Sequence, residues 1–202
     1  MLQRLIARLR PAPLASREAL RTFLQERASL IAQKCAIDYC RGKTGLASYA
    51  LFTEKPFLEA LDLCHWESFV AVLADLLIVT EGHLRPHALP EGQGRLRDGL
   101  LALYREALES LPLPAHRPQG WHDAIEALRS RLASAAAAAP RQTVEIADHS
   151  ARRLFETLPI HSSMRELDEE VVFGAVRFRM IAVNQEMQRR LAAAEVARQL
   201  AG

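Results

Sequence analysis

The stretch FLEALDLCHWESFVAVLADLLIVT, residues 57–80, decides how this chain folds, because it is the most apolar part of the sequence. Acidic residues interrupt it, and its longest run without a charged residue, 68–74, is much shorter than the ~20 apolar residues that span a bilayer. A helix that is apolar on most of its sides is buried on most of its sides. The stretch therefore predicts a central core helix and not a membrane span.

The segments around this core helix also have helical periodicity. Ser16 can cap a helix that runs to about Arg41. Apolar residues recur at helical spacing in three later segments, 96–111, 121–132 and 144–158. No segment alternates polar and apolar residues for long. The pattern predicts an all-α protein in which about seven or eight helices form a single bundle-like domain over residues 1–202.

Two features bear on how the domain is completed. The proline-rich linker 111–120 is a possible internal boundary. A capping box formed by Ser163 and Glu166 predicts a long C-terminal helix that reaches about Leu200, almost forty residues. A helix of that length outruns its own domain, so its apolar tail would pack on a partner or back over the bundle. We expect self-association of the chain into a homodimer through this helix.

The composition and the charge restrict the possible partners. Half of the 202 residues are hydrophobic, which is enough for a core, and the net charge is +2. Residues 1–56 carry a net charge of +6 and residues 57–111 carry −5, which predicts that the two segments face each other within a chain or across a dimer. The basic segment lacks interleaved aromatic residues and contains no DNA-reading motif. Nucleic acid is therefore not an expected partner.

The compartment is predicted from the cysteines and the N-terminus. Cys35, Cys40 and Cys64 form no disulfide framework, which favours a reducing cytoplasm. Arginines interrupt the apolar residues of segment 2–9, so this segment is not a typical secretory signal. Its apolar residues follow helical spacing, and we expect a short amphipathic helix that docks on its own domain. The alternatives are contact with a membrane surface and a transit peptide.

The sequence YCRGKTGLASY, residues 39–49, contains the last three letters of a phosphate-binding P-loop, GKT, at 42–44. The complete motif requires a glycine five residues before Gly42 and a preceding strand. Ile37 occupies that position, and the residues before it continue a helical pattern. We therefore predict that ATP and GTP do not bind, and that Gly42 and Thr44 serve as helix caps.

Patterns for metal binding and for nucleophilic catalysis are absent from the sequence. The histidines form no H-E-x-x-H or E-x-x-H motif, and Pro86 separates His83 from His87. There is no G-x-S-x-G elbow. The cysteines lie on apolar helical segments, where buried structural thiols are common. We therefore predict no metal, cofactor or catalytic residue, and the sequence favours a binding role over an enzyme.

Two functions agree with these observations. The first is a non-enzymatic protein–protein interaction or scaffold module that forms a homodimer. The second is a helical bundle with an internal pocket that binds or acts on a small anionic ligand. The polar groups of such a pocket would be Arg41, Lys43, Thr44, Asp75 and Arg179. Their convergence on one cavity would favour the second function, and their dispersal would favour the first.

A charged pair is also expected inside the core. Asp75 lies in the most apolar run of the chain, and Arg179 shares a helical stripe with Val172, Val176 and Val183. Because a buried carboxylate and a buried guanidinium each require a partner, we hypothesise that Asp75 and Arg179 pair between two packed helices. The alternative is that Asp75 reaches water at the edge of its helix.

Overall fold

The structure is a computed structural model that describes residues 12–202, so the amphipathic helix expected at 2–9 lies outside the described range. The described residues are all-α, as predicted, and contain no β-strand. The helices are α2 (Arg17–Thr44), α3 (Ser48–Leu51), α4 (Lys55–Leu84), α5 (Gln93–Glu109), α6 (His122–Ala136), α7 (Thr143–Thr157), α8 (Ser162–Arg165), α9 (Glu169–Arg190) and α10 (Ala193–Ala201), with 3₁₀ turns at Gly45–Ala47, Arg85–His87 and Pro90–Gly92.

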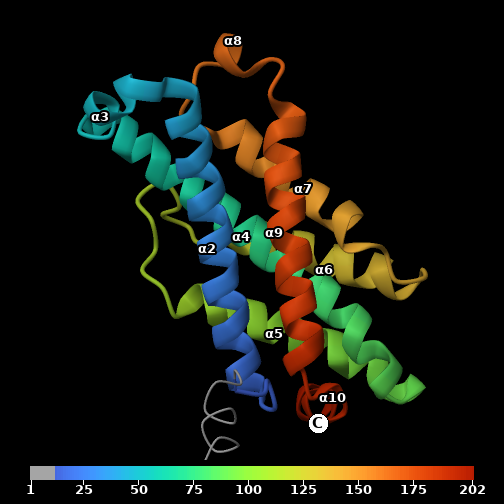
Figure 1. Ribbon diagram of the computed structural model, residues 1–202. Helices are drawn as coiled ribbons and strands as arrows, with labels where there is room; N and C mark the ends of the chain where they lie inside the picture. Colours follow the sequence, from blue (N-terminus) through green and yellow to red (C-terminus); the bar gives the residue numbers. More distant parts are fainter. Residues whose placement is uncertain (1–11) are drawn as a thin grey trace, which may run out of the picture.

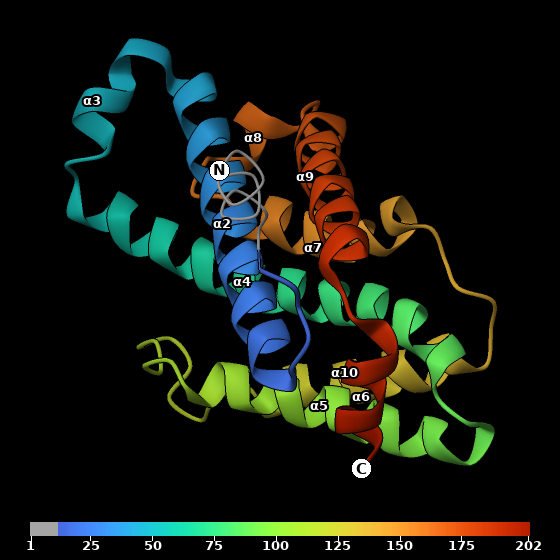
Figure 2. The ribbon, with the colours of Figure 1, turned by 60° about the horizontal axis from the view of Figure 1, so that its bottom comes forward.

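Helix α4 is the central helix that the apolar stretch predicts. It contacts α2, α5, α6, α7, α9 and α10, and every residue from Glu67 to Glu81 is buried. Figures 1 and 2 show α4 crossing the middle of the molecule, with α5 on one side and α7 on the other. By length and composition this helix could cross a membrane, but most of its apolar stretch is buried inside the protein. That burial is typical of the core helix of a soluble protein.

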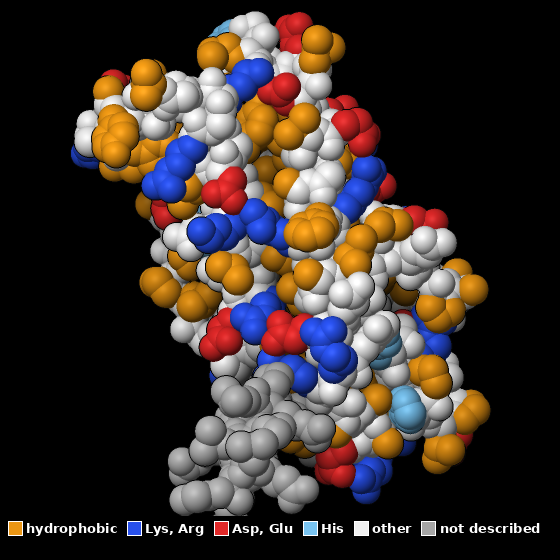
Figure 3. Space-filling view, viewed as in Figure 1, with side chains coloured by type: hydrophobic (Ala, Val, Ile, Leu, Met, Phe, Trp, Pro, Cys, Tyr) orange, Lys and Arg blue, Asp and Glu red, His pale blue; other side chains and the backbone are white. Residues whose placement is uncertain are grey.

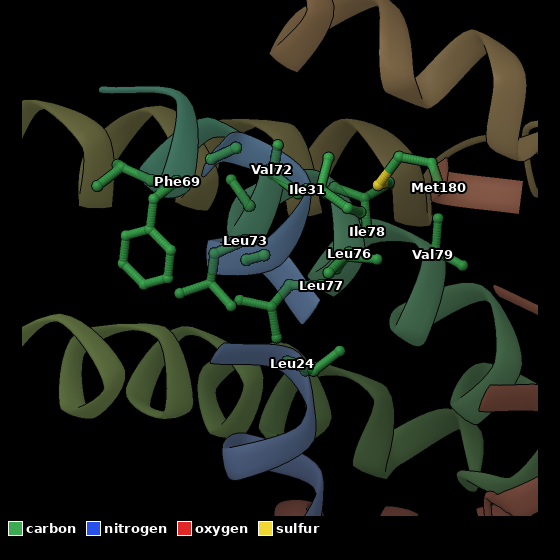
Figure 4. Close-up of a cluster of buried hydrophobic side chains, with 14 of the residues drawn as sticks. Leu24, Ile31, Phe69, Val72, Leu73, Leu76, Leu77, Ile78, Val79 and Met180 are labelled. Atoms are coloured by element: carbon green, nitrogen blue, oxygen red, sulfur yellow. The ribbon is translucent and has the colours of Figure 1, made fainter. Parts of the chain in front are cut away.

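The core surrounds α4, against which α2 and α7 pack most extensively, and α9 contributes further side chains to it. Figure 4 shows Leu24 and Ile31 from α2 close to Leu73 and Leu77 from α4, and Met180 of α9 reaches the same cluster. Buried residues on both sides of the linker 111–120 belong to one hydrophobic cluster. The described helices therefore share a single core.

The cap predicted for the N-terminus of α2 is present, whereas the caps predicted near its C-terminus are not. The Ser16 side chain accepts a hydrogen bond from the backbone N–H of Ala19 (3.1 Å), which is the predicted N-cap. At the other end, Gly42 lies inside the helix, and Thr44 makes no side-chain capping bond. The residue that ends α2 is Gly45, whose φ of 53° favours glycine. The two caps expected at 42 and 44 are therefore wrong.

The long helix expected from Ser163 to Leu200 is also wrong, because it is interrupted before and after α9. Residues 191 and 192 leave the helix and pair with the chain that leads into α2. The Leu14 N–H donates to the Arg190 carbonyl (2.8 Å), and the Ala192 N–H donates to the Leu14 carbonyl (3.1 Å). This pairing supplies partners for backbone groups that a continuous helix would bond internally. The helix therefore breaks, and α10 starts in a new direction.

Helix α10 packs back over the bundle. Its apolar residues Val196, Ala197 and Leu200 are buried, and it lies against α5. A side chain at Gly99 of α5 would meet the Leu200 carbonyl oxygen at 2.3 Å, so only glycine allows this close approach. Of the two positions expected for the apolar tail, on a partner or over its own bundle, the structure has the second.

Candidate functional site

The residues that resemble a P-loop lie at the C-terminal end of α2, where each has a structural partner. Lys43 Nζ lies 2.6 Å from an Asp168 carboxylate oxygen. The Thr44 hydroxyl donates to a backbone carbonyl one helical turn earlier. The Arg41 guanidinium lies over the ring of Phe52, 5.5 Å from its centroid. These residues therefore stabilise the end of a helix and do not surround a cavity.

Asp75 is fully buried, and its partners come from α6 and α7. Arg131 Nη2 donates to Asp75 Oδ1 (2.5 Å), and His149 Nδ1 lies 3.0 Å from the same oxygen. The backbone N–H of Ser150 donates to Asp75 Oδ2 (2.9 Å). Both carboxylate oxygens are thus hydrogen-bonded, as a buried carboxylate requires.

The pair expected between Asp75 and Arg179 does not form. Arg179 Nη2 lies 2.8 Å from Asp38 Oδ2 on α2, and about a third of the Arg179 side chain is exposed. Asp75 lies on the side of α4 that faces α6 and α7, whereas Arg179 lies on the side of α9 that faces α2. The helical stripe that Arg179 shares with three valines predicts an inward side chain, and its Nε is indeed inaccessible to water. It could not show which helix packs opposite.

The five residues expected to form one anion pocket are therefore dispersed. Arg41, Lys43 and Thr44 lie at the C-terminal end of α2, Arg179 lies on α9 beside Asp38 of α2, and Asp75 lies beneath α6 and α7. None of the five main pockets within residues 12–202 includes two of them among its lining residues. This dispersal favours the interaction function over the expected pocket.

A second buried carboxylate, Glu67, was not among the expected site residues. Arg117 donates to both of its oxygens (2.6 and 2.8 Å), Arg153 Nη2 lies at 2.5 Å, and His116 Nε2 lies at 3.1 Å. Burial alone would raise the pKa of Glu67, but the hydrogen bonds from Arg117 and Arg153 outweigh burial and lower the pKa to about 2. Glu67 therefore joins α4 to α7 and to the linker before α6.

One signal in the sequence could have found Glu67. It lies eight residues before Asp75 in the apolar stretch, a separation that leaves both carboxylates toward the same side of a helix. Two acidic residues on one side of a core helix predict a polar seam against whatever packs there. The arginines that fill this seam come from elements that are distant in sequence, so their identity was not predictable from spacing.

A pocket lies between the C-terminal half of α4, the end of α6 and the start of α7. It has a volume of about 500 Å³ and mixes apolar with charged walls. Its charged residues are Glu81, Arg85, Arg131 and Arg141. Arg85 is held by both oxygens of buried Glu81 (2.7 and 2.9 Å) and by two carbonyls at the end of α6. Arg141 is exposed, and its partners lie on one residue: its Nη2 donates to the Glu145 backbone carbonyl (3.1 Å), and its Nε lies 3.6 Å from the Glu145 carboxylate.

A different surface lies on the outside of α2 and α9, which run side by side in opposite directions in Figure 1. Leu30 of α2 is 47% exposed, and Phe178 of α9 is 71% exposed. Both line a groove of about 440 Å³ between the two helices. Figure 3 shows hydrophobic side chains on this face with basic and acidic side chains around them. A partly apolar centre with a charged rim is typical of a protein–protein interface.

The nucleophilic and metal-ligating side chains do not form a catalytic arrangement in the described part of the chain. Cys35, Cys40 and Cys64 are buried as free thiols. Burial raises the pKa of all three and brings that of Cys40 to about 12, so each stays protonated at neutral pH. Within residues 12–202, no group of three histidine, cysteine or acidic side chains is placed to hold a metal ion.

Comparison with known proteins adds no functional information, because no family model, no curated protein and no solved structure matches this chain.

Proposed function

We propose that this chain is a non-enzymatic protein–protein interaction module of the cytoplasm, which self-associates through the outer face of α2 and α9. The observation that carries the proposal is the exposure of Leu30 and Phe178 on the two walls of one groove. Large apolar side chains grouped on a surface mark interaction sites more often than isolated ones do. The cytoplasmic part rests on the three free cysteines.

The position of the proposed interface differs from the one that the sequence indicated. The apolar residues of α10 are covered by the chain itself, so they are not available to a partner. Helix α9, the main part of the expected C-terminal helix, keeps Phe178 exposed. Self-association through the C-terminal region is therefore proposed for the face that α9 shares with α2, and not for the tail.

The proposed interface predicts the effect of two substitutions on the oligomeric state. The wild-type chain should have a mass in solution of twice 22.6 kDa. Leu30→Asp or Phe178→Asp should weaken dimerisation about tenfold to a hundredfold, because each places an unpaired charge in a closing apolar contact. Analytical ultracentrifugation over a concentration series measures the dissociation constant.

The matched control is Leu89→Asp, because Leu89 is 69% exposed and lies in the turn after α4, away from this face. It should leave the dimer unchanged. A wild-type chain that stays monomeric at 200 μM contradicts the proposal, and so does a dimer that tolerates both substitutions at the groove.

One observation favours the second function, a pocket for a small anionic ligand. The pocket between α4, α6 and α7 is lined by three arginines and one carboxylate, so positive charge is in excess there. Its volume of about 500 Å³ falls in the range of small-molecule sites. Arg141, whose ion pair is long and exposed, is the arginine best placed to meet a ligand. A carboxylate with a short apolar body fits this combination.

If the pocket binds anions, it should bind hexanoate more tightly than hexanol, a neutral molecule of the same chain length. Hexanoate should shift the NMR signals of Ile78 and Ile146, which line the pocket, at lower concentrations than hexanol does. Arg141→Ala should remove that preference, whereas Arg129→Ala, on the exposed side of α6, should not. Equal responses to hexanoate and hexanol would exclude an anion site here.

A further inference from the structure

The outer ridge of α2 carries a short repeating pattern of charges. Glu26, Leu30 and Lys34 follow one another at intervals of four residues, so they form one row along the helix, and all three are exposed. Neither Glu26 nor Lys34 has an ion-pair partner among residues 12–202. Most other cations of α2 are paired within the chain: Arg17 with Glu106, Arg21 with Glu18, Arg27 with Glu186 and Lys43 with Asp168.

Leu30, the middle member of this row, lies on a crest between two grooves. It lines the groove of about 440 Å³ that Phe178 closes on the α9 side. It also lines a groove of about 650 Å³ on the α4 side, whose apolar walls include Trp66 and Phe69. A ridge bordered by two grooves is the shape that a second helix fits by ridges-into-grooves packing.

We infer that α2 of one chain pairs with α2 of a second copy, antiparallel and with the two-fold axis beside Leu30. In this arrangement Glu26 of each copy faces Lys34 of the other. The α-helix rises 1.5 Å per residue, so the two charges lie about 6 Å to either side of Leu30, and reversing the helix exchanges their positions. This inference rests on the proposed function and specifies its partner and its register.

The order of the charges is what selects a second copy. An interface with two-fold symmetry uses the same patch on both subunits, so the patch has to be complementary to itself. The row on α2 is complementary to itself when the two helices run antiparallel, because its acidic, apolar and basic residues are equally spaced. Parallel pairing in the same register would place Glu26 against Glu26 and Lys34 against Lys34, which is repulsive.

Charge reversal tests the register directly. Glu26→Lys leaves two basic residues around Leu30, and Lys34→Glu leaves two acidic residues, so each variant alone should dimerise about tenfold or more weakly than the wild type. An equimolar mixture of the two variants should form a heterodimer with nearly wild-type affinity, because every facing pair is then opposite in charge. Native mass spectrometry distinguishes the species once one variant carries a mass tag.

Two control variants reverse exposed charges away from this ridge: Glu91→Lys and Arg105→Glu. They should dimerise as the wild type does, and mixing them should give no preference for the heterodimer. The homodimers of Glu26→Lys and Lys34→Glu should also recover as salt is raised from 0.05 to about 0.5 M, since salt screens exposed charges.

The outcomes separate this inference from the proposed function. If Leu30→Asp abolishes the dimer but the charge-reversal variants dimerise normally and show no heterodimer preference, the antiparallel register is wrong and the interface stands. If Leu30→Asp and Phe178→Asp leave the dimer intact, the proposed interface itself is wrong. A wild-type monomer overturns both.

Discussion

Replacing Asp75 with alanine should lower the free energy of unfolding by about 3 kcal/mol, because it leaves the partners of a fully buried carboxylate without their acceptor. The Ser150 N–H, which donates to Asp75 at 2.9 Å, would lose its hydrogen bond in a buried position. Arg131 is about a quarter exposed and can partly recover solvation, so the expected loss lies at the lower end of the range for broken buried pairs. Urea denaturation at pH 7 measures the change.

A double-mutant cycle identifies the partner of Asp75. Asp75→Ala and Arg131→Met should be coupled by about 1 kcal/mol or more, since the two side chains are in contact. Asp75→Ala and Arg179→Met should be additive within about 0.5 kcal/mol, because these side chains belong to different contacts. The surface control Asp148→Ala, which breaks a partly exposed pair with Arg177, should cost under about 1 kcal/mol. Additivity with Arg131 would contradict the observed pairing.

Replacing Glu67 with glutamine should cost about 2 kcal/mol of unfolding free energy at pH 7, and this cost should shrink only below about pH 4.5. Ion pairing with Arg117 and Arg153 lowers the pKa of Glu67 to about 2 in the folded chain, from about 4.5 when exposed. A carboxyl whose pKa is lowered by folding stabilises the protein above its unfolded pKa, and this contribution is lost as the pH falls through the folded pKa. The window of loss therefore runs from about pH 4.5 to about pH 2.

The measurement compares unfolding free energies of the wild type and Glu67→Gln at pH 7, 5 and 3.5. The difference between them should be constant from pH 7 to 5 and should shrink at pH 3.5. Glu156→Gln is the matched control. The Glu156 carboxylate lies 3.8 Å from the Arg153 guanidinium, but about half of the Glu156 side chain is exposed. Its effect should be small at every pH. A difference between wild type and Glu67→Gln that does not change with pH would mean that the carboxylate charge contributes nothing.

The central position of α4 is a property of its own sequence. The apolar stretch determined that this helix is central, because apolar side chains cover most of its sides. The same stretch favoured a buried Asp75, since its helical neighbours are apolar, and the structure has Asp75 buried and not at a helix edge in water. These are properties of a single helix, and the period of 3.6 residues is enough to establish them. The N-cap at Ser16 belongs to the same class of local features.

The tertiary structure decided the features that depend on two segments. Periodicity gives the direction of a side chain around its own helix, but not which helix lies opposite, so the partner of Asp75 was Arg131 and not Arg179. The break after Arg190 depends on backbone pairing with Leu14, which is far away in the sequence. The exposure of Leu30 and Phe178 likewise follows from how α2 and α9 pack, because apolar residues at helical spacing do not show which of them a neighbouring helix will cover.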